Sequence, residues 1–152
     1  MQENELIWIN TETKRQLTQE QVEQAIYRSR QGGNPVELVI VGKAFNYLLE
    51  YYWLPQFIGE CRIFARMSPL DKAKCVRLHM ANHITAMCGD GGNDAGALKA
   101  AHAGIALSGN GSSVVSHFSS ADVSINSCVE LLREARCSLD VSFASYKYFS
   151  LT

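Results

Sequence analysis

The sequence lacks the features that mark membrane-spanning, secreted or zinc-binding proteins. No apolar run reaches the ~20 residues of a membrane-spanning helix, and the acidic start, Met1–Glu5, is unlike a signal peptide. The five cysteines form no C-x-x-C pair. Their odd number favours free thiols in a reducing compartment over a disulfide or zinc framework. His79 and His83 lie four residues apart, without the neighbouring acid of an H-E-x-x-H zinc motif.

The chain also lacks an excess of charge of either sign. Fourteen lysines and arginines stand against 15 acidic residues, which gives a net charge of -1. Broad electrostatic binding of nucleic acid is therefore not expected. Hydrophobic residues make up 47% of the 152 positions and charged residues 19%, as in a globular chain. This length suits one compact domain.

Apolar patterns with the spacing of strands alternate with patterns typical of helices, which predicts an α/β fold with a mostly parallel sheet covered on both faces. Thr18 and Gln21 have capping-box spacing, and Ser68 is the expected cap of a helix with Pro69 in its first turn. The strands at 37–41 and 84–88 are expected to be buried. Strands are predicted at residues 6–9, 37–41, 62–65, 84–88, 104–107 and 122–125, and helices after Thr18, at 44–53, 68–82 and 95–101, and from Cys128 onward.

The segment Gly89–Asp94 follows a predicted strand and holds the strongest candidate site. It places Asp90, Asn93 and Asp94 among three glycines. Two carboxylates this close favour a hard cation such as Mg²⁺, and the glycines would allow a sharp turn near a ligand. An ordinary surface turn of Asx and Gly residues is the alternative. The loop lacks the G-K-[ST] ending of a P-loop, and Ala101 stands where a calcium loop needs Glu.

Lys72 is the second candidate, because it lies in the first turn of the predicted helix 68–82, after a strand. There its ammonium group could reach the same edge of the sheet and meet a phosphate; a solvated surface lysine is the alternative. A carboxylate nucleophile should end the first strand of such a site, but no aspartate precedes Asp71. The sequence thus provides a magnesium loop and a phosphate-binding lysine without the group to be phosphorylated.

Two segments, Phe64–Lys72 and Met87–Lys99, resemble the phosphorylation domain of P-type ATPases, which belong to the haloacid dehalogenase-like superfamily. The resemblance rests on S-P-x-x-K followed by G-D-G-x-N-D. Residues 101–108 are similar to the fifth class of these pumps, in its B branch. Residues 132–149 are similar to the stalk that leads into the next membrane helix. The resemblance to these pumps implies a Rossmann-like, haloacid dehalogenase-type three-layer sandwich, which is incomplete because its first strand segment is missing.

The resemblance also assigns roles to residues of this chain. Asp90 would be the main Mg²⁺ ligand, with Asp94 as a further ligand and Asn93 supporting the metal and the phosphoryl group. Lys72 would neutralise the phosphorylated aspartate. The loop glycines Gly89 and Gly91 would shape the phosphate loop. In the family, Mg²⁺ and ATP phosphorylate an aspartate in D-K-T-G-T and hydrolysis drives transport of a cation or polyamine. That motif is absent, so the isolated chain is expected to be inactive.

Two positions depart from the family pattern. Gly92 stands where relatives generally have a side chain, which should loosen the loop, and Ala95 replaces a cysteine, which should be tolerated. The resemblance predicts a partial phosphorylation domain at 1–140 and the start of a stalk or membrane helix at 141–152.

The expected partners are the remaining domains of a parent pump in an endomembrane, with this segment on the cytoplasmic side. An unpaired strand edge predicts self-association or marginal stability of the isolated chain. The alternatives are a non-enzymatic decoy or interaction module and, with less support, a soluble phosphatase, which the missing aspartate disfavours.

Overall fold

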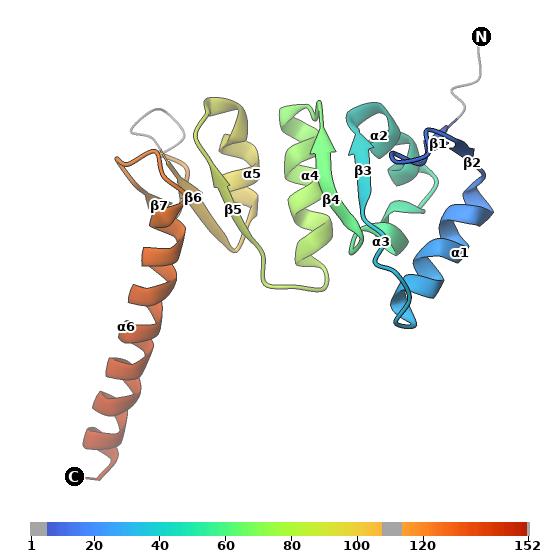
Figure 1. Cartoon of the computed structure of the whole chain (residues 1–152). Coiled ribbons are helices and arrows are strands. Elements are labelled where there is room, and N and C mark those ends of the chain that lie inside the picture. The colour runs from blue at the N-terminus through green and yellow to red at the C-terminus, as the bar shows by residue number, and fades with distance from the viewer. Residues whose placement is uncertain (1–5, 108–113, 152) are drawn as a thin grey trace. The chain divides into compact units, whose positions relative to one another are not determined.

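The computed structural model describes residues 6–107 and 114–151, which fall into two compact units whose boundary in the sequence lies between Asp71 and Lys72. Figure 1 shows helices and strands alternating along the chain. The paired strands are mostly parallel, so the prediction of an α/β fold is confirmed. The predicted turn at 108–112 lies outside the described residues.

The first unit begins with a short antiparallel pair, β1 (Trp8–Ile9) and β2 (Gln16–Leu17). The predicted capping box of Thr18 and Gln21 forms and starts α1 (Gln19–Arg30). Next come β3 (Leu38–Val41), α2 (Gly42–Glu50), α3 (Leu54–Phe57) and β4 (Cys61–Ala65). Strands β3 and β4 pair in parallel. The largest fully buried side chains here are those of Ile40, Phe45, Leu48 and Leu54.

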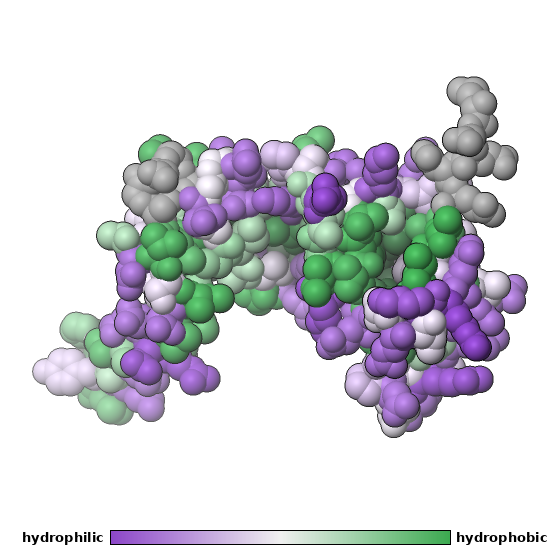
Figure 2. All heavy atoms as spheres, turned by 45° about the horizontal axis from the view of Figure 1, so that its top comes forward, coloured by the Kyte–Doolittle hydropathy of each residue, from purple (hydrophilic) through white to green (hydrophobic). Residues whose placement is uncertain are grey.

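The predicted burial of the strand at 37–41 is only half right. Leu38 and Ile40 are buried, but the alternating residues Val39 and Val41 are 52% and 48% exposed. Their neighbour across the parallel pair, Ile63, is 55% exposed. One face of this two-stranded sheet is therefore uncovered within the described residues, contrary to the expectation of cover on both faces. Figure 2 shows apolar side chains at the surface in this part of the chain.

Helix α4 (Pro69–Met80) begins in the first unit, and from Lys72 onward it belongs to the second. The second unit continues with β5 (Ala86–Gly89), the short 3₁₀ helix η1 (Gly92–Asp94), α5 (Ala95–Ala100) and β6 (Ala103–Ala106). Then come β7 (Phe118–Ser119) and α6 (Asn126–Ser150). Strands β5, β6 and β7 form a parallel sheet in that order.

One buried cluster of the second unit includes residues of α4 and α5. Val76 from α4 packs with Ala97 and Ala101, and Met80 and Met87 lie against this cluster. The strand predicted at 84–88 is not buried: Ile84 is 90% exposed, and the residues of β5 are exposed or partly buried. Gly104 of β6 packs so closely on α5 that a Cβ there would lie 2.2 Å from the carbonyl oxygen of Leu98.

The strand predicted at 122–125 is wrong, because Phe118–Ser119 takes the place beside β6 instead. Polar turn contacts follow it: the amide of Asp122 donates to the hydroxyl of Ser120. The predicted long helix forms as α6, which runs without interruption past residue 140 and has no buried residue. None of the helices within the described residues is both long and apolar enough to cross a membrane.

Candidate functional site

The structure brings Lys72 and Asp94 into direct contact, although 22 positions separate them in the sequence. The Nζ atom of Lys72 donates to Oδ1 of Asp94 over 2.7 Å. The side chain of Asp94 is 13% exposed and that of Lys72 is 35% exposed. Solvent therefore reaches the ammonium group more readily than the carboxylate, so a ligand could approach from the lysine side.

Asp94 is free to accept from Lys72 because it does not cap the helix that it precedes. It occupies the cap position before α5, but its side chain makes no capping hydrogen bond there. Its backbone amide instead donates to the carbonyl of Gly91, which closes the loop after β5. The carboxylate is thus held at the carboxyl end of β5, the edge where open α/β sheets bind ligands.

Gly89 is required at the end of β5 by the close approach of Asp94. A Cβ at position 89 would lie 2.8 Å from Oδ2 of Asp94 and 2.9 Å from its Cβ. The expected turn forms as the 3₁₀ helix η1, without left-handed backbone at its glycines. Gly91 has an extended backbone, and among the described glycines only Gly32 has a positive φ. The loop therefore uses glycine for space at position 89 rather than for left-handed backbone.

Asp90 and Asn93 lie on the same loop, and both residues are exposed. Asp90 follows β5 directly and also interacts within the chain. At Gly92 the surroundings are open, because a Cβ there would meet no atom within 4 Å. A side chain at this position would therefore begin in open space.

The first turn of α4, which precedes Lys72, is fixed by a buried carboxylate. Asp71 is 6% exposed and accepts hydrogen bonds from the hydroxyl of Ser68 over 2.6 Å and from Nδ2 of Asn46 over 3.1 Å. The Asp71 amide donates to Ser68 in return, so the predicted cap is present. The sequence does not identify Asn46, because 25 positions separate it from Asp71 and no local pattern links them.

Gly42 and Arg66 bring the ends of β3 and β4 close together. A Cβ at position 42 would lie 2.5 Å from the carbonyl oxygen of Arg66, and Arg66 itself adopts a left-handed backbone with φ 53°. This close approach lies where the chain leaves β4 and enters the turn that starts α4. Gly42 belongs to the first unit and is a structural requirement that sequence analysis did not assign.

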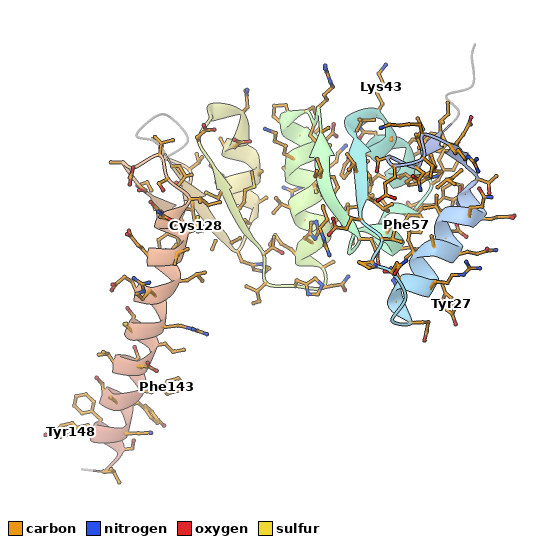
Figure 3. All side chains as sticks on the ribbon, in the orientation of Figure 1. Tyr27, Lys43, Phe57, Cys128, Phe143 and Tyr148 are labelled. Atoms are coloured by element: carbon orange, nitrogen blue, oxygen red, sulfur yellow. The ribbon has the colours of Figure 1, made fainter. Side chains whose placement is uncertain are left out.

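Two thiols are in contact next to the start of the loop Gly89–Asp94. Sγ of Cys128, in the first turn of α6, donates to Sγ of Cys88 in β5 over 3.4 Å. Burial, reinforced by this contact, raises the pKa of the Cys88 thiol to about 11. Figure 3 shows Cys128 at the end of α6 nearest the sheet, with Phe143 and Tyr148 farther along the helix.

The donor set fits a hard cation that is shared with a phosphate. Asp90 and Asp94 both lie at the carboxyl end of β5, and Mg²⁺ is commonly held by one or two carboxylates together with phosphate oxygens and water. Within residues 6–107 and 114–151, no cluster of three or more His, Cys, Asp or Glu side chains could hold a metal by itself. The arrangement therefore suits Mg²⁺ bound jointly with a phosphate better than a metal held by protein alone.

Curated relatives match most of this chain. It is 44% identical over 117 residues to the polyamine-transporting ATPase 13A2 of Mus musculus, a match that covers 75% of this chain and 10% of the relative. It is 43% identical over 113 residues to the probable cation-transporting ATPase 13A4 of Gallus gallus, covering 72% of this chain and 9% of the relative. For the probable cation-transporting ATPase 13A5 of Homo sapiens, identity is 39% over 124 residues, with 80% and 10% covered.

No family model matches the sequence. The chain spans about a tenth of the length of the curated relatives that it matches.

Proposed function

Since this chain is a homologue of the type V P-type ATPases of the 13A family, we propose that it supplies half of a phosphorylation site in a longer transport ATPase. This half binds Mg²⁺ and stabilises the transferred phosphoryl group. The contact between Lys72 and Asp94 at the end of β5 carries the proposal. It brings together, at one edge of the sheet, an ammonium group that can bind phosphate and a carboxylate that can bind a metal ion.

In this proposal Mg²⁺, when bound, neutralises negative charge on the phosphate oxygens. Asp90 and Asp94 hold the metal, and Asn93 supports the metal and the phosphoryl group. Lys72 donates to the phosphorylated carboxylate while Asp94 keeps its ammonium group oriented. Fixed charges of this kind stabilise the transition state because they need not reorganise during the reaction. Gly89 leaves the space that Asp94 occupies.

The phosphorylated aspartate comes from another segment, since none precedes Asp71 in this chain. The isolated chain therefore hydrolyses no ATP. The fold is a haloacid dehalogenase-type sandwich without its first strand segment, with residues 1–140 as part of the domain and 141–152 leading toward the membrane. The parent transports a cation or a polyamine across an endomembrane, and this segment faces the cytoplasm.

A chimera tests this proposal directly. This chain replaces the matching segment of the mouse polyamine-transporting ATPase 13A2, and formation of the phosphorylated enzyme from labelled ATP and Mg²⁺ is measured. We expect a phosphorylated chimera, and loss of phosphorylation with Asp90→Asn. The matched control is Asp140→Asn, which removes an exposed carboxylate of α6. A chimera that reaches the membrane folded but is never phosphorylated, or that is unaffected by Asp90→Asn, would contradict the proposal.

The exposed apolar face of β3 and β4 favours a second candidate, a non-enzymatic interaction module. Val39, Val41 and Ile63 are each about half exposed on this face. Light scattering of the isolated chain distinguishes the two, because a monomer at all concentrations removes the support for self-association. A soluble phosphatase is a weaker third candidate, which absence of hydrolysis of p-nitrophenyl phosphate would exclude.

A further inference from the structure

Cys88 and Cys128 form a thiol contact that the proposed phosphorylation chemistry does not use. Their sulfur atoms lie 3.4 Å apart, although the residues are 40 positions apart in the sequence. A disulfide bond is about 2.05 Å long, so the two sulfur atoms need to approach by only about 1.4 Å. Both residues lie in the second unit, within one parallel sheet and the helix that follows it.

The surroundings of the two thiols hold them together and leave them within reach of small molecules. Cys88 pairs in register with Ile105 in the middle strand of the sheet. The amide of Cys128 donates to the carbonyl of Ile125, which fixes the first turn of α6. Ser127 adds a second contact of this turn, because its hydroxyl lies 2.9 Å from that of Ser120, the residue after β7. Both cysteines are partly buried, whereas Cys61 is fully buried and Cys137 is exposed.

We propose that Cys88 and Cys128 are a redox pair, which a peroxide converts into an intramolecular disulfide. One sulfur attacks a peroxide oxygen, the O–O bond breaks, and a sulfenic acid and one water form. The second thiol then attacks the sulfenic sulfur, the S–O bond breaks, and the disulfide and a second water form. Two thiols are oxidised by two electrons and the peroxide is reduced. A small thiol reverses the reaction by disulfide exchange.

The position of the pair gives this modification a consequence. Cys88 lies in β5 directly before Gly89, the residue against which Asp94 packs. The bond would tie the strand that presents this loop to the first turn of α6. Oxidation would therefore restrict movement between the end of β5 and the start of α6. This inference concerns residues of this chain alone and does not depend on the proposed transport function.

The test uses the folded chain of 152 residues. It is treated with hydrogen peroxide, the remaining thiols are alkylated, and the chain is digested without reductant for mass spectrometry. We expect one linked pair of peptides that contain Cys88 and Cys128, a loss of two of the five free thiols, and recovery with dithiothreitol. The native chain should form this bond on the order of tenfold faster than the urea-unfolded chain, because the fold holds the sulfur atoms in contact.

Variants identify the partners. Cys128→Ser and Cys88→Ser should each abolish the linked peptides, while Cys137→Ser, at an exposed site of α6, should leave them unchanged. If a serine variant does not fold, the peptide map of the unaltered chain still decides. Peroxide treatment that leaves all five thiols free, that links other cysteines, or that links this pair equally fast in urea would overturn the proposal.

Discussion

Lys72 and Asp94 form an ion pair of 2.7 Å between the first turn of α4 and the residue that precedes α5. Since the lysine side chain is 35% exposed, the pair contributes only about 0.2–1 kcal/mol to folding. The pair thus adds little to stability, although the distance between its charged atoms is short. We therefore interpret the pair chiefly as a means of holding the ammonium group beside the loop Gly89–Asp94.

Lys72→Met should abolish most phosphorylation in the chimera with the mouse ATPase. Loss of one fixed donor at a site of developing charge commonly costs about 10²–10³-fold in rate. The matched control is Lys99→Met, which removes an exposed lysine of α5. Phosphorylation rates under single-turnover conditions provide the measurement. Equal rates for the Lys72 and Lys99 variants would show that Lys72 is an ordinary surface lysine.

Gly104→Ala and Gly92→Ala should differ strongly in stability. The Cβ of alanine would overlap the backbone of Leu98 at position 104, so we expect destabilisation of about 1–3 kcal/mol or more. At position 92 there is open space and no left-handed backbone, so alanine should be neutral or stabilise by up to about 1 kcal/mol. Urea unfolding monitored by circular dichroism measures both changes. Destabilisation by Gly92→Ala would mean that the loop needs its glycine for another reason.

Glu60→Gln should destabilise the chain in a manner that depends on pH. The hydrogen bonds from Arg30, at 2.7 and 2.9 Å, lower the pKa of the Glu60 carboxyl. The ionised form therefore stabilises the fold above the unfolded pKa of about 4.3. This contribution is lost as the pH falls through the lowered folded pKa. Because Arg30 is 53% exposed, we expect only about 0.2–1 kcal/mol at neutral pH.

Unfolding free energies at several pH values test this prediction, with Glu37→Gln as the control. Glu37 pairs with Arg62 at 3.5 Å, and both side chains are more than half exposed, so its loss should matter less. A difference between Glu60→Gln and the unaltered chain that does not shrink in acid would contradict the assigned pKa shift.

Ile63→Lys should reduce self-association of the isolated chain. Ile63 is 55% exposed on the uncovered face of β3 and β4, and a charged side chain there opposes apolar contact between copies. The control is Leu139→Lys on α6, where the replaced side chain is also 55% exposed. Light scattering over a range of concentrations gives the mass of each variant. Equal association of both variants would assign any contact to another surface.

Local sequence patterns predicted the helix starts well, because a cap depends on residues only three positions apart. Thr18 with Gln21 and Ser68 with Asp71 both form the expected contacts. The mostly parallel pairing of the main strands followed from the alternation of patterns along the chain, but their division into separate sheets did not. The helix from the last quarter of the sequence also forms as expected.

Strand positions that depend on distant partners were predicted less well. The β-branched residues at 122–125 favour a strand, but the edge of β6 pairs with Phe118–Ser119 instead. Burial at 37–41 was overestimated because apolar composition does not show which face lacks a covering layer. Within the candidate site, Asp90, Asp94 and Lys72 were identified from motifs. Asn46 and the space reserved at Gly89 depend on contacts that only the folded chain shows.

Helix α6 has 25 residues and no buried side chain, and its first turn contacts β5 through Cys128 and the residue after β7 through Ser127. A continuous helix of this length measures about 37 Å and resists bending. If α6 rotates about the contact of Cys128 with Cys88, its far end moves much farther than its first turn. A tilt of about 10° at this contact would displace the far end by about 6 Å. A small rearrangement at the proposed phosphate site would thus reach the far end of α6 as a larger movement.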